Sequence, residues 1–76
     1  MYVWTVWIEE RWTNTPNGVW EPNDNEYNVV ADNAPEAIEK VRILVVGRDY
    51  VDDDGKIQEV VDARVVGIKR GAELDA

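Results

Sequence analysis

The stretch EYNVVADNAPEAIEKVRILVVG, residues 26–47, decides the fold because it holds a strand followed directly by a helix. Its first part, residues 26–31, has the β-branched and aromatic composition of a short strand. Asn33 is a good helix N-cap, and Pro35 is tolerated in the first turn because no amide donor is needed there. Glu36, three residues after Asn33, completes the arrangement of a capping box.

A single amphipathic helix is predicted over residues 34–46. Its apolar positions fall at the spacing of three, four and seven that forms one buried stripe. These positions are Ala37, Ile38, Val41, Leu44 and Val45. Gly47 follows as a favourable residue for ending the helix. A helix of this length is marginal in isolation, so it must pack on a sheet.

The remaining strands are predicted on both sides of this stretch. Residues 2–12 alternate, which places one set of side chains in the core and the other set on the opposite face. The expected core set is Tyr2, Trp4, Val6, Ile8 and Trp12, and the opposite set is Val3, Thr5, Trp7, Glu9 and Arg11. Asn17-Gly18 predicts a turn, and residues 21–25 an irregular polar stretch.

The last third predicts a turn and one long strand. Residues 52–55, Asp-Asp-Asp-Gly, form the turn, and Tyr50-Val51 before it can pair with Lys56-Ile57 after it. Residues 57–69 are rich in β-branched side chains, and the doubled valines in this long strand indicate a bulge or bend.

We therefore expect one small α+β domain over residues 1–70, in the order β-β-α-β. Three long strands form a curved antiparallel sheet, and one helix packs on one of its faces. Residues 71–76 are expected to be a frayed acidic tail. A chain of 76 residues is one domain with little stability to spare.

A short resemblance supports this order of elements. Residues 29–41, VVADNAPEAIEKV, are similar to a phrase found in many small β-β-α-β proteins, in which a strand ends in Val-x-Ala and a helix opens with Glu-Ala. The archaeal ribosomal protein LX is one family with this topology. The resemblance implies the topology alone, because RNA binding needs a basic surface and this chain has a net charge of −8.

The composition argues against catalysis. The chain has no Cys, no His and no Ser, which removes the usual nucleophiles, the proton shuttle of neutral pH and the soft metal ligands. Carboxylate pairs such as Glu9 with Glu59, or Asp62 with Glu26, could act as acid and base, but they alternate with apolar residues as on a solvated strand face. We expect no enzyme, no cofactor and no metal centre. We also expect a cytoplasmic protein with no signal peptide and no membrane span.

The acidic balance, sixteen Asp and Glu against eight Lys and Arg, suggests a function. Carboxylates can stand where phosphates would stand and occupy the basic groove of a nucleic-acid-binding protein. In size and charge the chain resembles the small acidic inhibitors that phages carry against restriction and CRISPR systems. Direct nucleic-acid binding is not expected. The residues expected to contact the basic partner are Glu9, Glu10, Asp49, Asp52, Asp53, Asp54 and Glu59. The alternative interpretation is solubility or adaptation to high salt.

The acidic segment 49–59 also has some features of a calcium loop. An EF-hand needs oxygen ligands at its first and twelfth positions and Gly at its sixth. With Gly55 as the sixth residue, the first is Tyr50 and the twelfth is Val61, neither of which supplies a carboxylate. A dedicated calcium site is therefore not expected, and weak cation binding by the aspartates stays open.

The tryptophans suggest a second contact surface. Trp4 and Trp12 fit the core face, where aromatic side chains bury the most area. Trp7 shares the opposite face with Val3, and a single helix leaves that face uncovered. Trp20 lies beside a polar loop. Val3, Trp7 and Trp20 therefore form a candidate apolar contact surface, and homodimerisation through it is the alternative function.

Overall fold

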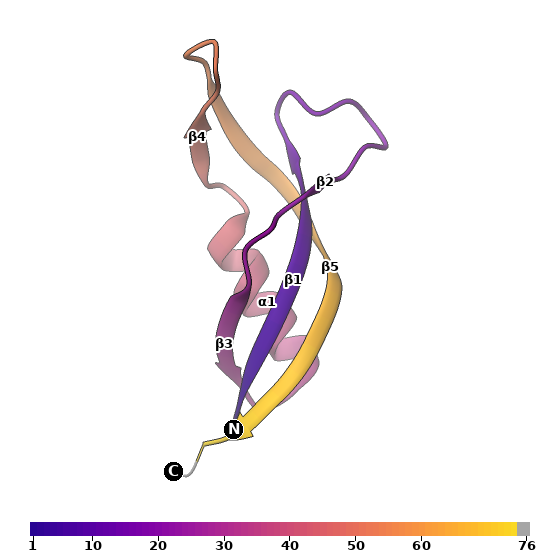
Figure 1. The fold of residues 1–76 in the computed structure, drawn as a ribbon, viewed down its shortest axis with the longest axis vertical. Coiled ribbons are helices and arrows are strands. Elements are labelled where there is room, and N and C mark those ends of the chain that lie inside the picture. Colours follow the sequence, from indigo (N-terminus) through magenta and orange to yellow (C-terminus); the bar gives the residue numbers. More distant parts are fainter. Residues whose placement is uncertain (75–76) are drawn as a thin grey trace.

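The computed structural model describes residues 1–74, in which one helix lies against one face of a curved antiparallel sheet (Figure 1). The elements in chain order are β1 (Tyr2–Trp12), β2 (Glu21–Pro22), β3 (Tyr27–Ala31), α1 (Ala34–Val45), β4 (Asp49–Val51) and β5 (Ile57–Glu73). The expected α+β class, with one helix on one face of the sheet, is confirmed. Within the described part the sheet has five strands, because β2 and β4 add two short ones.

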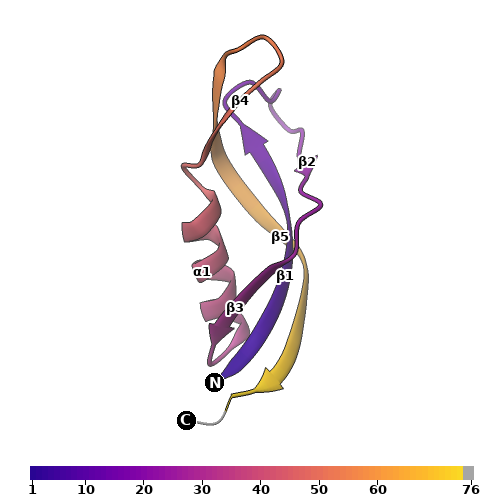
Figure 2. The ribbon, with the colours of Figure 1, turned by 60° about the vertical axis from the view of Figure 1, so that its left-hand side comes forward.

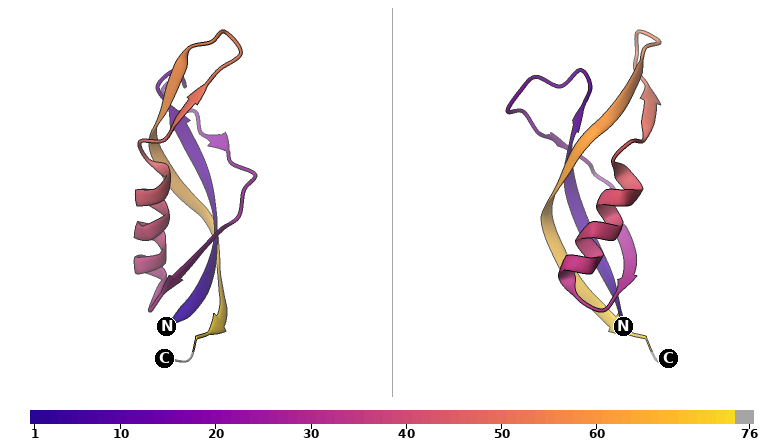
Figure 3. Two further views of the ribbon diagram at one scale, coloured as in Figure 1. Left: turned by 90° about the vertical axis from the view of Figure 1, so that its left-hand side faces the viewer. Right: turned by 180° about the vertical axis from the view of Figure 1, so that it is seen from behind.

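β1 is the centre of the sheet. It pairs with β5 along one edge and with β2 and β3 along the other, and β4 pairs with the start of β5. The helix lies on the concave side of the two long strands (Figure 2). The long dimension of the molecule is 47 Å. The loop between β1 and β2 and the β4–β5 hairpin both project at the end where β5 begins, beyond the last turn of α1 (Figure 3).

The doubled valines of β5 lie at bulges, as predicted. Trp7 pairs with Gly67 and Ile8 pairs with Val65, so Val66 has no opposite residue on β1. The same shift between Arg11 and Trp12 leaves Val61 unmatched. Each extra residue bends β5 and shifts the alternation of its side chains by one position, so that the apolar residues after the bulge again face the helix. These bulges account for the curvature around α1.

The caps of α1 follow from the sequence. The Asn33 side chain accepts a hydrogen bond from the Glu36 amide at 2.9 Å. Glu36 accepts from the backbone amide of Asp32, one residue before the cap. Gly47 has a φ of +93°, the left-handed conformation expected after a helix. The helix ends at Val45, one residue earlier than predicted.

The core is a narrow stripe between the helix and the sheet. Its buried members are Val6, Ile8, Val29, Ala31, Ala37, Val41, Val45, Val60 and Ala63. Trp4 and Trp12 pack at its margins. The expectation that Leu44 belongs to the buried stripe is wrong: Leu44 is 57% exposed and Ile43 71%. Ala37, Val41 and Val45, which form one i, i+4 row, are buried against this narrow sheet, and Ile38 beside them is half-buried, whereas Ile43 and Leu44 remain in water.

Two segments are more ordered than predicted. Glu21–Pro22, expected to be irregular, pairs with Glu9 and Glu10 of β1. β5 continues to Glu73, and the Leu74 amide donates to the Met1 carbonyl at 2.8 Å, so fraying does not begin at residue 71. Residues 75–76 of the expected tail lie outside the described residues. Within residues 1–74, no helix has the length and apolar character needed to cross a bilayer.

Candidate functional site

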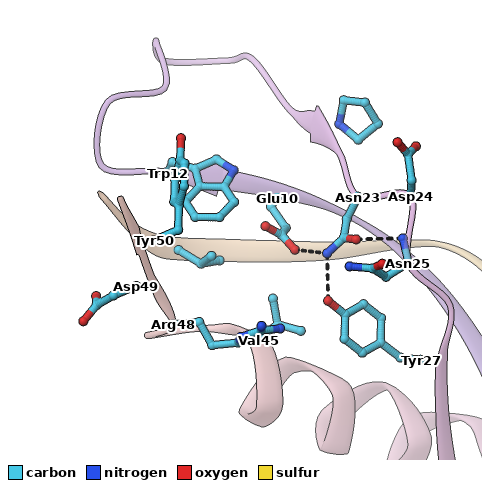
Figure 4. Close-up of a pocket in the computed structure, with 12 residues that line it drawn as sticks. Glu10, Trp12, Asn23, Asp24, Asn25, Tyr27, Val45, Arg48, Asp49 and Tyr50 are labelled. Atoms are coloured by element: carbon cyan, nitrogen blue, oxygen red, sulfur yellow. Dashed lines mark hydrogen bonds between the residues drawn. The ribbon is translucent and has the colours of Figure 1, made fainter. Parts of the chain in front are cut away.

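A pocket of about 400 Å³ opens on the helix side of the sheet, beyond the last turn of α1 (Figure 4). Its floor comes from β1 and β5, one wall from residues 22–27, and the other wall from the end of α1 and the start of β4. The lining residues are Glu10, Trp12, Val60, Pro22, Asn23, Asp24, Asn25, Tyr27, Val45, Arg48, Asp49 and Tyr50. Segments far apart in sequence thus meet around one hollow.

Glu10 lies on the floor of this pocket and is only 5% exposed. Asn23 donates from its side-chain nitrogen to one carboxylate oxygen of Glu10 and to the Tyr27 hydroxyl, the latter at 2.8 Å. The Asn23 oxygen in turn accepts from the Asn25 amide at 2.9 Å. The other oxygen of Glu10 has no donor among residues 1–74. A buried carboxylate with an unused oxygen thus faces the hollow.

Glu10, expected among the exposed acids of the contact surface, is therefore buried instead. It stands opposite Ala63 on the helix side of the sheet. Its position in the chain contained the signal, because Glu10 alternates with Ile8 and Trp12 and so shares their face. The supporting residues Asn23, Tyr27 and Tyr50 were not predicted to form a site. They come from a polar stretch and a short hairpin whose neighbours depend on the tertiary fold.

An aromatic pair forms one side of the pocket. The rings of Trp12 and Tyr50 meet edge to face, with 4.0 Å between centroids and 70° between planes. Figure 4 shows the Glu10 carboxylate between this pair and Asn23. The pocket therefore combines a buried carboxylate with an aromatic wall.

The charges that line the pocket are mostly negative. Asp24 and Asp49 are exposed at opposite walls, and Arg48 is the one basic residue among the described residues that line it. More acids lie next to the pocket or on the hairpin beyond it. We call the resulting surface the acidic end and define it as the exposed acids around the buried Glu10, namely Glu21, Asp24, Glu26, Asp49, Asp53, Asp54 and Glu59. Asp49, Asp53, Asp54 and Glu59, four of the predicted partner-binding acids, are thus exposed at one end.

Asp52 differs from its neighbours because its carboxylate is used within the β4–β5 turn. One oxygen accepts from the amides of Asp54 at 3.0 Å and Lys56 at 2.9 Å, and the other accepts from the Gln58 side chain at 2.9 Å. The hydrogen bond from Gln58, followed by that from the Lys56 amide, lowers the pKa of Asp52. The role of Asp52 in this structure is to hold the turn, while Asp53 and Asp54 point to solvent.

Glu9, the last of the predicted acids, is on the opposite face of the sheet. Arg64 pairs with it, with a nitrogen–oxygen distance of 2.7 Å. Arg64 also lies over the Trp20 ring, at 4.7 Å from its centroid, and Arg11 lies at 5.7 Å from the same ring. Trp20 is thereby partly covered by the protein itself.

The apolar surface predicted around Trp7 is less open than expected. Val3 and Trp7 are half-buried, and the Trp7 ring packs directly over Gly67. The apolar groove of about 410 Å³ lies elsewhere, between α1 and β3, and is lined by Val29, Val30, Lys40, Ile43 and Leu44. Lys40 donates to the Val30 carbonyl at 2.6 Å, which places a charged side chain over the β3 edge.

The described residues contain no cluster of three or more potential metal ligands. With a buried carboxylate, aromatic rings and acidic walls, the pocket has the chemistry to receive a positively charged group that donates hydrogen bonds. Comparisons of the chain with protein-family models, with curated proteins and with solved structures found no match.

Proposed function

We propose that this protein is a non-enzymatic binding module whose acidic end contacts a basic surface on another protein. One observation supports this function more than any other. Residues 22–25, which include Asp24, and residues 48–50, which include Asp49, lie on either side of a pocket with a buried carboxylate on its floor. Their carboxylates therefore act together on an approaching cation, which raises its encounter rate.

The distribution of ion pairs also supports the acidic end as the contact surface. The acids that pair with Lys, Arg or the N-terminus are Glu9, Asp32, Glu36 and Asp62. All of them lie outside the acidic end. The carboxylates of the acidic end form no such pairs within residues 1–74, so their charge is available to a partner.

The finer form of this proposal is that the partner binds nucleic acid and that the acidic end takes the place of phosphates. The protein would then inhibit that partner by occupying its groove. Double-stranded DNA should compete with the protein for the partner. A complex that excess DNA leaves intact would remove the mimicry and leave the protein-binding function.

The experiment uses two variants with the same change of net charge. Asp53→Asn with Asp54→Asn removes two charges from the acidic end, and Glu39→Gln with Glu73→Gln removes two charges from exposed acids away from it. Partners captured by the wild-type protein are purified, and the dissociation constant of each complex is measured at 0.1 M and 1 M salt. The screening length falls from about 10 Å to about 3 Å over this range.

We expect the first variant to weaken the complex more than the second, and high salt to weaken the wild-type complex. Equal effects of the two variants would show that net charge alone matters, and would contradict a contact surface at the acidic end. A complex insensitive to salt would contradict the electrostatic function altogether. Self-association through Val3, Trp7 and Trp20 stays the competing prediction.

A further inference from the structure

We infer that the pocket at the acidic end receives one arginine side chain of the partner protein, and that Glu10 accepts a hydrogen bond from its guanidinium. This inference rests on the proposed function, because it names the group of the basic partner that enters the pocket. Its starting point is the unused carboxylate oxygen of Glu10. Glu10 is 5% exposed, its second oxygen opens to the pocket, and the one side chain that donates to the carboxylate, Asn23, is neutral, so an entering cation would pair a negative charge that is largely withdrawn from water.

The surroundings of Glu10 favour a cation. Asp24 and Asp49 add negative charge at the two walls. Val45, the last residue of α1, lines the pocket, so the negative end of the helix dipole lies beside it. The charges of Asp24 and Asp49 and the end of the helix dipole are all negative, and all lie around the pocket that Glu10 faces.

The aromatic wall favours arginine over lysine. A guanidinium is planar and weakly hydrated, so it can stack on an aromatic ring and enter a partly buried site more easily than an ammonium group. Trp12 and Tyr50 supply such rings at the pocket. The opposite face of the sheet already contains this kind of contact, because Arg64 lies 4.7 Å from the centroid of the Trp20 ring. A volume of about 400 Å³ leaves room for the side chain.

Arg48 is the group that opposes an incoming cation. It lines the pocket but forms no ion pair with Glu10 or with another carboxylate within residues 1–74. Its backbone is held by hydrogen bonds to Val45 and Val60. Glu10 thus has no ion-pair partner in Arg48, while the positive charge of Arg48 repels a cation that enters the pocket. Removing its charge should strengthen binding.

The test uses N-acetyl-arginine methylamide as the probe and the corresponding citrulline compound as its neutral control. Each is titrated into the ¹⁵N-labelled protein, and the Trp12 indole and Asn23 side-chain signals are followed by NMR. We expect saturable shifts of both signals with the arginine compound. The citrulline compound should bind at least about tenfold more weakly, since it lacks the charge that strengthens the hydrogen bond.

Two variants separate the role of Glu10 from that of the surrounding charge. Glu10→Gln keeps an acceptor for Asn23 but removes the charge, and should weaken arginine binding by about tenfold or more. Arg48→Gln should strengthen it. The Trp4 indole, which donates to the Ala31 carbonyl at 2.9 Å, lies outside the pocket and reports whether each variant is folded.

Equal shifts with the arginine and citrulline compounds, or undiminished arginine binding by folded Glu10→Gln, would overturn the inference. The same variant in the partner complex distinguishes this failure from failure of the proposed function. If Asp53→Asn with Asp54→Asn weakens the complex and Glu10→Gln does not, the acidic contact surface stands and the arginine pocket is wrong. If Glu10→Gln weakens it as well, both stand.

Discussion

At the scale of single residues, Asp52 is an acid whose carboxylate is occupied by hydrogen bonds within its own turn and is therefore not free to contact a partner. Its carboxylate accepts hydrogen bonds from Asp54, Lys56 and Gln58. Gln58 is itself buried and accepts from Thr13 at 2.6 Å, which ties the β4–β5 turn to the end of β1. The turn therefore depends on Asp52 in its charged form.

This dependence predicts a pH effect. Hydrogen bonds in the folded state lower the pKa of Asp52 below its ordinary value of 3.8. The stabilisation is thus fully present above that value and is lost as the pH falls through the folded pKa. Asp52→Asn should reduce the free energy of unfolding at pH 7, and the difference from wild type should shrink as the pH falls below the ordinary value of 3.8. Urea unfolding across this range measures it, with the solvent-facing Asp53→Asn as control. A difference that is constant with pH would contradict the prediction.

Gly71 is required by a close approach of two strands. A Cβ atom at this position would lie 2.8 Å from the Val3 carbonyl oxygen, which belongs to the backbone and cannot turn aside. Gly71→Ala should therefore push β1 and β5 apart and cost about 1–3 kcal/mol of unfolding free energy. Val66→Ala, an exposed change on the same strand, should stay within about 0.5 kcal/mol of wild type. Thermal unfolding of the two variants tests this, and equal values would show that the strands have room.

At the scale of elements, α1 is held by one narrow row of side chains. Val41 is fully buried against the sheet, whereas Ile43, two residues later, is 71% exposed. Val41→Ala should cost about 2 kcal/mol, because it removes buried methyl groups and leaves a cavity. Ile43→Ala removes a larger side chain but should cost under about 0.5 kcal/mol. Denaturant unfolding compares them, and a larger loss for Ile43→Ala would mean that the helix packs through its other side.

The hairpin β4–β5 and the segment 21–26 are the elements that create the site. Neither is long enough to form a stable sheet alone. Each is joined to a long strand: Asp49–Val51 pairs with Ile57–Glu59, and Glu21–Pro22 with Glu9 and Glu10. The two segments are attached to different strands of the sheet, and the space between them is the pocket. Neither segment's own sequence indicates this space.

At the scale of the whole molecule, charge and shape decide how copies meet. The net charge is −8 on a body 47 Å long, and the Trp7 surface is half-buried. We therefore expect a monomer at 0.1 M and at 1 M salt, as measured by sedimentation velocity. A dimer at both salts would favour the competing hypothesis of self-association.

The surface used by such a dimer can be identified with two substitutions. Trp7→Glu would dissociate a dimer that forms through the predicted sheet face, and Ile43→Glu would dissociate one that forms through the apolar groove beside α1. A dimer lost only with Ile43→Glu would remove the Trp7 face as a contact surface.

The sequence by itself determined the features that depend on neighbouring residues. The helix with its Asn33 cap, the turn that ends in Gly55 and the bulges at the doubled valines were all predicted. Each follows from a local period, a cap or a turn, which act over a few residues. The α+β class follows from their order along the chain.

Only the tertiary structure decided which residues form the site. The sequence placed Glu10 among the exposed contact acids and Leu44 in the buried stripe of the helix, whereas Glu10 is 5% exposed and Leu44 57%. The reason is geometric. Whether a residue is buried depends on where α1 ends along the curved sheet. It also depends on which distant segments, here residues 22–27 and 48–50, flank the part of the sheet that the helix leaves uncovered. The pocket exists because Val45 is the last residue of the helix while β1 and β5 continue beyond it.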